Sequence, residues 1–123
     1  MFGKKVAVFE NKKLGGTCVN VGCVPKKVMY GVADFLDTVK LMHHGYGFSK
    51  LLKNKNSSYI DTSSVTFNFQ DFKNARDAYV KRLNNIYANN LENSKVDHIE
   101  GTAQFINNDT VQCGEEKYTA DHI

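Results

Sequence analysis

The feature that most constrains this chain is a pair of cysteines, Cys18 and Cys23, with four residues between them. They lie in the stretch GGTCVNVGCVPKK, residues 15–27, with glycines before them and a proline and two lysines after. In the chain-entropy model, a disulfide that closes so short a loop stabilises a fold by about 2 kcal/mol, much less than one closing a long loop. A bond between these cysteines is therefore better suited to opening and closing than to holding a fold together.

The residues after the cysteines predict a helix over 25–43. Pro25 suits the first position of a helix, because its missing N–H has no partner there. Apolar side chains then recur every three or four residues, at Val28, Val32, Phe35, Val39 and Met42. We expect Cys23 just before the helix N-terminus, where the helix dipole and the nearby Lys26 and Lys27 favour a thiolate. We expect Cys18 in an extended segment that faces the incoming substrate.

Two other interpretations of the cysteines remain open from the residues alone: two buried free thiols, or half of a metal site. A zinc site would need CxxC-type spacing and a second pair of ligands. The remaining candidate ligands are not arranged in that way; they are His43, His44, His98, His122 and Cys113. We therefore predict no metal site.

Two stretches carry a resemblance to a known family. Residues 15–27 resemble the redox motif of the pyridine nucleotide–disulfide oxidoreductases, which are FAD-dependent enzymes. Lipoamide dehydrogenases and mercuric reductases usually carry Pro-Ser-Lys where this chain has Pro25-Lys26-Lys27, which favours the glutathione, trypanothione and thioredoxin reductases. The stretch RDAYVKRLNNIY, residues 76–87, resembles the helix that borders the disulfide substrate in the glutathione-reducing branch.

The resemblance implies an α/β fold: a partial FAD-binding domain of the Rossmann type (three-layer ββα) with a small β-meander. We expect one incomplete domain over 1–123, with the redox motif at 14–27, a variable loop at 49–64, a substrate-side helix at 70–91 and a β-meander at 95–123. A buried strand, 4–10, should end at Glu10. The fingerprint G-x-G-x-x-G does not precede that strand, so we expect the first βα unit to be lacking.

The resemblance also implies a function for the longer enzyme, the NADPH-dependent reduction of glutathione disulfide through FAD and a Cys18–Cys23 disulfide. The NADPH domain is expected outside these residues, and the enzyme is expected to be a homodimer. Two alternatives stay open: a thioredoxin or trypanothione reductase of the same family, and a truncated fragment without catalytic activity.

Site residues follow from the resemblance, residue by residue. The catalytic residues are Cys18, Cys23 and Lys26. The residues expected to bind FAD are Glu10, Gly16, Thr17, Cys18, Cys23, Lys26, Thr102 and Ala103. The residues expected to contact glutathione disulfide are Tyr87, Tyr79, Ile86 and Asn90. Cys113 falls in the predicted β-meander and is expected to be inert.

Composition constrains the binding partners and the cellular compartment that we expect. The chain has 123 residues, 41% of them hydrophobic, and a net charge of +3 with its lysines spread out, which does not favour binding to nucleic acid or membranes. No stretch approaches the length of a membrane span. Three cysteines fit a reducing compartment, so we expect a cytoplasmic location, with mitochondria as the alternative.

Overall fold

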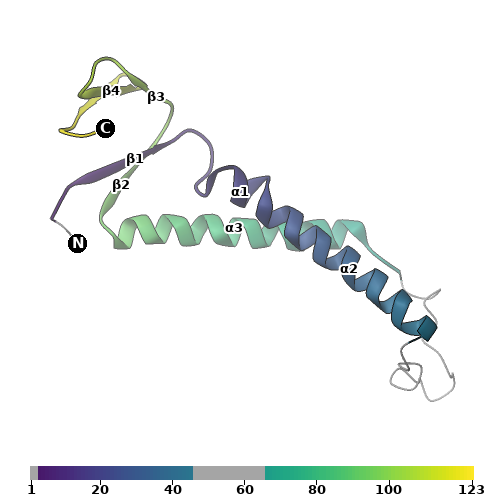
Figure 1. Ribbon diagram of the computed structural model, residues 1–123. Helices are drawn as coiled ribbons and strands as arrows, with labels where there is room; N and C mark the ends of the chain where they lie inside the picture. The colour runs from purple at the N-terminus through teal and green to yellow at the C-terminus, as the bar shows by residue number, and fades with distance from the viewer. Residues whose placement is uncertain (1–2, 46–65) are drawn as a thin grey trace.

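The structure is a computed structural model that describes residues 3–45 and 66–123 (Figure 1). The predicted variable loop, 49–64, lies outside the described residues, as do the side chains of His43 and His44. The chain forms one strand, then helices, then four strands. In order they are β1 (Val6–Glu10), α1 (Gly16–Asn20), α2 (Cys23–Gly45), α3 (Phe69–Asn93), β2 (Val96–Glu100), β3 (Ala103–Phe105), β4 (Thr110–Cys113) and β5 (Glu116–Thr119).

The strands β1 and β2 form a two-stranded parallel sheet, with Val6 opposite Val96 and Glu10 opposite Glu100. The Gly101 N–H continues this contact by donating to the Glu10 carbonyl at 2.9 Å. The prediction that residues 96–100 belong to a β-meander is therefore wrong. The backbone of β2 pairs with β1, and Gly101, with φ of 149°, separates β2 from the strands that follow.

The β-meander itself is confirmed over a shorter range, 103–119. β4 pairs antiparallel with both β3 and β5, and it carries the most buried side chains of this region, Val111 and Cys113. An edge-to-face contact between Phe9 and Tyr118, with ring centroids 5.1 Å apart, joins the meander to β1.

The two long helices lie side by side and run in opposite directions, forming an arm that extends away from the strands (Figure 1). α2 begins at Cys23, two residues earlier than predicted, so the prediction of Pro25 as the first helical residue is wrong. The first helical hydrogen bond runs from the Lys26 N–H to the Gly22 carbonyl at 3.1 Å, so the missing N–H of Pro25 costs no bond. Phe35, predicted on the apolar stripe, is 65% exposed, and Leu36 is half-buried instead.

The helix predicted over 70–91 is confirmed and is slightly longer. Asn68 caps it, because its side-chain oxygen accepts from the N–H groups of Gln70 and Asp71 at 3.0 and 3.2 Å. The predicted stripe is only partly buried. Of its residues, Phe72 and Leu83 are half-buried, whereas Ala75, Tyr79, Ile86 and Asn90 are exposed. Arg76, Val80 and Asn84, which the stripe did not include, are also half-buried.

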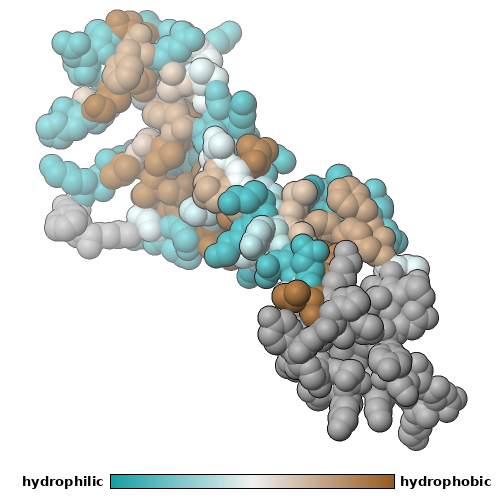
Figure 2. All heavy atoms as spheres, turned by 45° about the vertical axis from the view of Figure 1, so that its right-hand side comes forward, coloured by the Kyte–Doolittle hydropathy of each residue, from teal (hydrophilic) through white to brown (hydrophobic). Residues whose placement is uncertain are grey.

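Much apolar surface stays exposed in the described part of the chain. β1 was predicted to be buried, yet Val6 is 47% and Val8 is 37% exposed, because β2 is its single neighbour in the sheet. Figure 2 shows apolar atoms at the surface over the strand end of the molecule. Neither long helix, over the residues described, is apolar enough along its length to cross a bilayer.

The contact between Gly101 and Cys113 gives a first prediction. A Cβ on Gly101 would lie 2.4 Å from the Cys113 sulfur, and φ of 149° at this position is strained for any residue with a side chain. Gly101→Ala should therefore lower the free energy of unfolding by about 2–4 kcal/mol, measured by urea denaturation.

The same substitution in a Cys113→Ala background separates the two causes. The clash with sulfur is removed there and the backbone strain remains, so the cost of Gly101→Ala should shrink without vanishing. An equal cost in both backgrounds would show that the sulfur contact does not constrain this position.

Candidate functional site

A glycine turn places the first cysteine on a short helix. Gly15 and Gly16 have φ of 97° and 59°, which favours glycine at both positions. A Cβ on Gly15 would lie 2.7 Å from Cβ of Val19, a side chain that is 6% exposed. The turn therefore packs directly onto α1, and Cys18 lies within this helix. The prediction of an extended segment around Cys18 is wrong, because the turn begins a helix two residues before it.

A close backbone approach at Gly22 brings the second cysteine against the first. A Cβ on Gly22 would lie 2.9 Å from the Thr17 carbonyl oxygen and 3.2 Å from Cα of Cys18. The Val21 N–H donates to the same Thr17 carbonyl at 3.0 Å, which ends α1. The chain thus folds back within a few residues, so α1 and α2 meet at the two cysteines. Both side chains are exposed and both are free thiols in this structure.

The Cys23 side chain affects the protonation of Cys18. The pKa of the Cys18 thiol is raised, first by a hydrogen bond with the Cys23 side chain, then by partial loss of water and by the negative charge of Cys23. Backbone N–H groups of Cys23 and Val24 act in the opposite direction, because they point at the Cys18 sulfur. The N–H groups at the start of α2 are therefore directed at Cys18, whereas sequence reasoning had assigned the effect of the helix start to Cys23.

Two asparagines tie the glycine turn to α3. The Asn84 side-chain amide donates to the Leu14 carbonyl at 2.7 Å and to the Asn20 side-chain oxygen at 2.9 Å. The Asn20 amide in turn donates to the Gly16 carbonyl at 2.8 Å and to the Leu14 carbonyl at 3.2 Å. The turn before Cys18 is therefore held from two sides. Sequence reasoning missed both residues, although Asn20 lies inside the redox motif and Asn84 inside the second matching stretch.

An open cleft of about 1980 Å³ gathers part of the predicted FAD site. Four predicted residues line it: Glu10, Gly16, Thr17 and Lys26. The two cysteines, Thr102 and Ala103 are not among its lining residues. Thr102 lies beside the cleft, because its hydroxyl accepts a hydrogen bond from the side chain of Asn11 at 3.3 Å. Asn11 follows Glu10 in the chain and lines the cleft. The structure thus places the ends of β1 and β2 and the start of α2 around one space.

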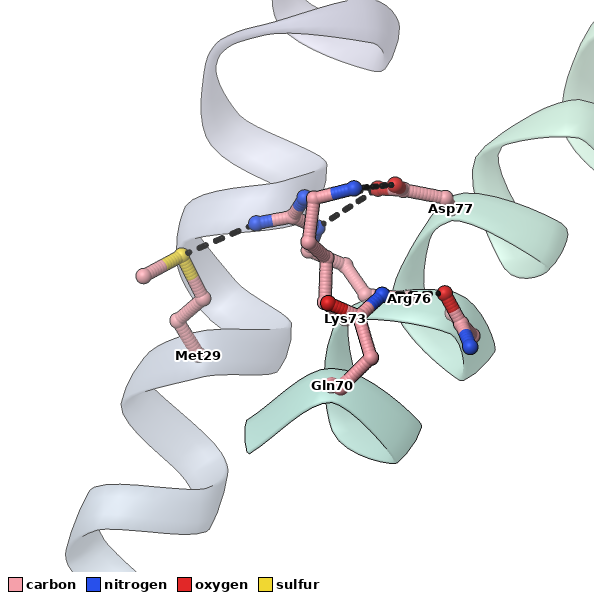
Figure 3. A network of polar contacts seen from close by, with 6 residues as sticks. Met29, Gln70, Lys73, Arg76 and Asp77 are labelled. Carbon is pink, nitrogen blue, oxygen red and sulfur yellow. Dashed lines mark hydrogen bonds and ion pairs between the residues drawn. The ribbon is translucent and has the colours of Figure 1, made fainter. Parts of the chain in front are cut away.

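One wall of the cleft is a polar contact between the long helices, drawn in Figure 3. Arg76 on α3 points toward α2, where its Nη1 lies 3.6 Å from the Met29 sulfur. Its Nη2 and Nε donate to Asp77 at 2.6 and 2.9 Å, and Lys73 pairs with the same carboxylate at 3.1 Å. These two cations lower the pKa of Asp77, Arg76 being the larger cause. Arg76 was not among the predicted site residues, although it is the first residue of the second matching stretch.

The residues predicted to contact substrate do not line the cleft. The residues of α3 that line it are Arg76, Asp77, Val80, Lys81, Asn84, Asn85 and Ala88. Tyr79, Ile86 and Tyr87 are 40%, 40% and 43% exposed, and Asn90 is exposed as well. Arg82 lies over the Tyr79 ring, 5.1 Å from its centroid. None of the four makes a hydrogen bond to Cys18 or Cys23 in the described part of the chain, so their substrate role stays a prediction.

Two further sequence predictions concern cysteine and metal chemistry. Cys113 is buried at 8% exposure beneath the β2–β3 connection, with its sulfur 4.0 Å from the Glu100 carbonyl. In residues 3–45 and 66–123, no three side chains among His, Cys, Asp and Glu group together as metal ligands would.

Comparisons with known proteins show the family and the fold of this chain. The family model for pyridine nucleotide-disulphide oxidoreductases matches residues 1–123. The chain is 46% identical over 108 residues to a glutathione reductase from Debaryomyces hansenii, a match that spans 86% of this chain and 20% of that protein. It superposes with a TM-score of 0.65 on the Cu(II) complex of an HOCl-induced flavoprotein disulfide reductase, RclA, from Escherichia coli, at 24% identity.

The structural match covers 97% of this chain and 21% of the solved one, so it bears on the fold. The predicted α/β fold class, a partial FAD-binding Rossmann-type arrangement, is confirmed. The chain spans about a fifth of the length of either relative.

The hydrogen bond between the cysteines can be tested by alkylation. In a Cys23→Ala variant the first cause of the raised Cys18 pKa is gone, while the backbone N–H groups remain. The rate at which iodoacetamide alkylates Cys18 rises with pH, and the midpoint of that rise should therefore lie at a lower pH than in the parent chain. Cys113 is buried and should react slowly in both proteins. An unchanged midpoint would show that the Cys23 side chain does not raise the pKa of Cys18.

The Asp77 contact predicts a pH dependence of stability. The pKa of Asp77 is lower in the folded chain than its ordinary value of 3.8, so the ionised carboxylate stabilises the fold at pH values above 3.8. That contribution is lost as the pH falls through the lowered value. The difference in unfolding free energy between the parent and Asp77→Asn should thus be present at pH 6 and shrink toward pH ~2. Salt should reduce it at pH 6, because the pair is exposed. A difference independent of pH would contradict the ion pair.

Proposed function

The chain belongs to the pyridine nucleotide-disulphide oxidoreductase family, and we propose that its Cys18–Cys23 pair reduces glutathione disulfide with electrons that come from NADPH through FAD. The observation that carries the proposal is the close backbone crossing at Gly22, where a Cβ would lie 3.2 Å from Cα of Cys18, so that Cys18 and Cys23 are brought together. Two exposed thiols at such a crossing suit a disulfide that forms and breaks. The glutathione reductase relative supports glutathione disulfide as the substrate.

We assign different roles to the two sulfurs. Cys18 attacks one sulfur of glutathione disulfide; that S–S bond breaks, one glutathione leaves and takes a proton, and a mixed disulfide remains on Cys18. The N–H groups of Cys23 and Val24 favour negative charge on the attacking sulfur, and they offset part of the rise in its pKa that the Cys23 side chain causes. Cys23 then attacks the Cys18 sulfur, and the second glutathione leaves with a proton. The pair has lost two electrons and is now a disulfide.

The residues around the cleft fit FAD. Glu10 uses one carboxylate oxygen to accept from the Lys12 N–H at 2.9 Å, and its position at the carboxyl end of β1 suits a ribose hydroxyl. Nothing lies within 4 Å of the position that a Cβ would take on Gly16, so a flat ligand can approach its backbone closely. Thr17 offers a hydroxyl, and Lys26 a positive charge that favours electron density on a neighbouring ring. FAD bound here would supply the electrons that reopen the Cys18–Cys23 disulfide.

Other parts of the proposal concern the longer protein. We propose that Tyr87, Tyr79, Ile86 and Asn90 contact glutathione disulfide, that the enzyme is a homodimer, and that it acts in the cytoplasm or mitochondria. We also propose that the 123-residue chain does not turn over repeatedly by itself, since it spans about a fifth of the length of its relatives.

Trapping the mixed disulfide tests the assignment of the two cysteines. In Cys23→Ser, attack by Cys18 on glutathione disulfide is expected to stop at one glutathione per chain, because the resolving thiol is absent. The parent chain should release two glutathione molecules and retain none. Mass spectrometry of the intact chain measures both.

Two controls make the test specific. Cys113→Ser should behave like the parent, because Cys113 is buried. Cys18→Ser should acquire glutathione at least tenfold more slowly than Cys23→Ser, an estimate that assumes Cys18 is the favoured nucleophile. Equal trapping in these two variants would contradict the assignment of Cys18 as the attacking residue.

A further inference from the structure

The asparagine pair described above suggests a link between the predicted substrate-side helix and the redox cysteines. α1 is five residues long, and a helix of that length is not stable by itself. Its position must therefore come from contacts with the rest of the chain, including the buried Val19 and polar contacts at its two ends. At the C-terminal end of α1, the Asn20 side chain donates hydrogen bonds to the Leu14 and Gly16 carbonyls. At the N-terminal end, the turn through Leu14 accepts one of these bonds.

Asn84 is the residue of α3 that reaches both of these contacts. Its side-chain nitrogen has two hydrogens and two acceptors, the Leu14 carbonyl at 2.7 Å and the Asn20 oxygen at 2.9 Å. A backbone carbonyl can only accept, which fixes the orientation of the Asn84 amide. Asn84 and Asn20 are both half-buried, so water competes weakly for these bonds.

We propose that Asn84 is a positioning residue for the Cys18–Cys23 pair. By holding both ends of α1 against α3, it sets the separation of the two sulfurs and therefore how readily they form a disulfide. Asn84 touches neither cysteine, and it acts through Leu14 and Asn20. The inference rests on the proposed function, because it assumes that the pair cycles between dithiol and disulfide.

The reaction that measures this is an equilibrium with glutathione. Two thiols of the chain and one glutathione disulfide give one Cys18–Cys23 disulfide and two glutathione molecules, so atoms and electrons balance. If α1 is held less firmly, the effective concentration of one thiol at the other falls, and the equilibrium constant falls with it. The chain carries a matched pair of sites for the test, since Asn89 lies on the same helix as Asn84, is exposed and does not line the cleft.

The experiment compares Asn84→Asp with Asn89→Asp in glutathione buffers of graded ratio, with the disulfide fraction read by acid quench and alkylation. Asp at 84 keeps the shape of the side chain but loses both donor hydrogens and faces the Leu14 carbonyl. We expect its equilibrium constant to fall about tenfold, which corresponds to about 30 mV. Asn89→Asp should match the parent, because Asn89 makes no side-chain hydrogen bond among the residues described.

Two further variants distinguish the positioning of α1 by Asn84 from a general loss of stability of the fold. Val111→Ala removes a buried side chain from β4 and should lower the unfolding temperature without changing the disulfide equilibrium. Asn84→Ser keeps one donor and should fall between the parent and Asn84→Asp.

The outcomes distinguish the two proposals. An Asn84→Asp equilibrium equal to that of the parent, or an equal fall in Val111→Ala, would overturn the role of Asn84 and leave the redox pair standing. A parent chain that forms no disulfide with glutathione disulfide would overturn both.

Discussion

The parallel pairing of β1 with β2 is the constraint on which the rest of the structure depends. Residues 6–10 bond to residues 96–100 in the same direction, so the chain between them must leave one end of the sheet and return to the other. The antiparallel helices α2 and α3 make that return. This topology also brings Glu10 and Glu100 side by side at the carboxyl ends of the strands, where ligands bind in open α/β sheets.

The candidate redox site then depends on a close backbone crossing rather than on a buried core. Gly22 lets the end of α1 approach the start of α2, so Cys18 lies close to Cys23. Both sulfurs remain exposed, as the proposed attack on a disulfide substrate requires. The rigidity that such a site needs comes from polar contacts around it, Asn20 and Asn84 on one side and Arg76 with Met29 on the other.

α3 has two distinct faces, and this explains why hydrophobic periodicity predicted the wrong buried residues for part of the helix. The stripe through Tyr79, Leu83, Ile86 and Asn90 has the spacing of a buried face, yet most of it is exposed. The side that packs on α1 and α2 carries Arg76 and Asn84 instead, whose polar ends find specific partners there. Hydrophobic spacing cannot distinguish a face that packs inside a domain from one that is kept open for a partner or ligand.

The sequence by itself determined the cysteine pair, the two long helices to within a few residues, most strand positions and, through two specific stretches, the family. These features are local, because helix and strand propensity, residue spacing and glycine positions can be read from short stretches of sequence. Only the tertiary structure decided that Cys18 lies in a helix, that β2 pairs with β1 rather than with β3, and that Asn84 holds the turn at Leu14. Each of these depends on contacts between residues far apart in sequence or on a backbone crossing. Such contacts are selected by the packing of whole elements, and no local pattern encodes them.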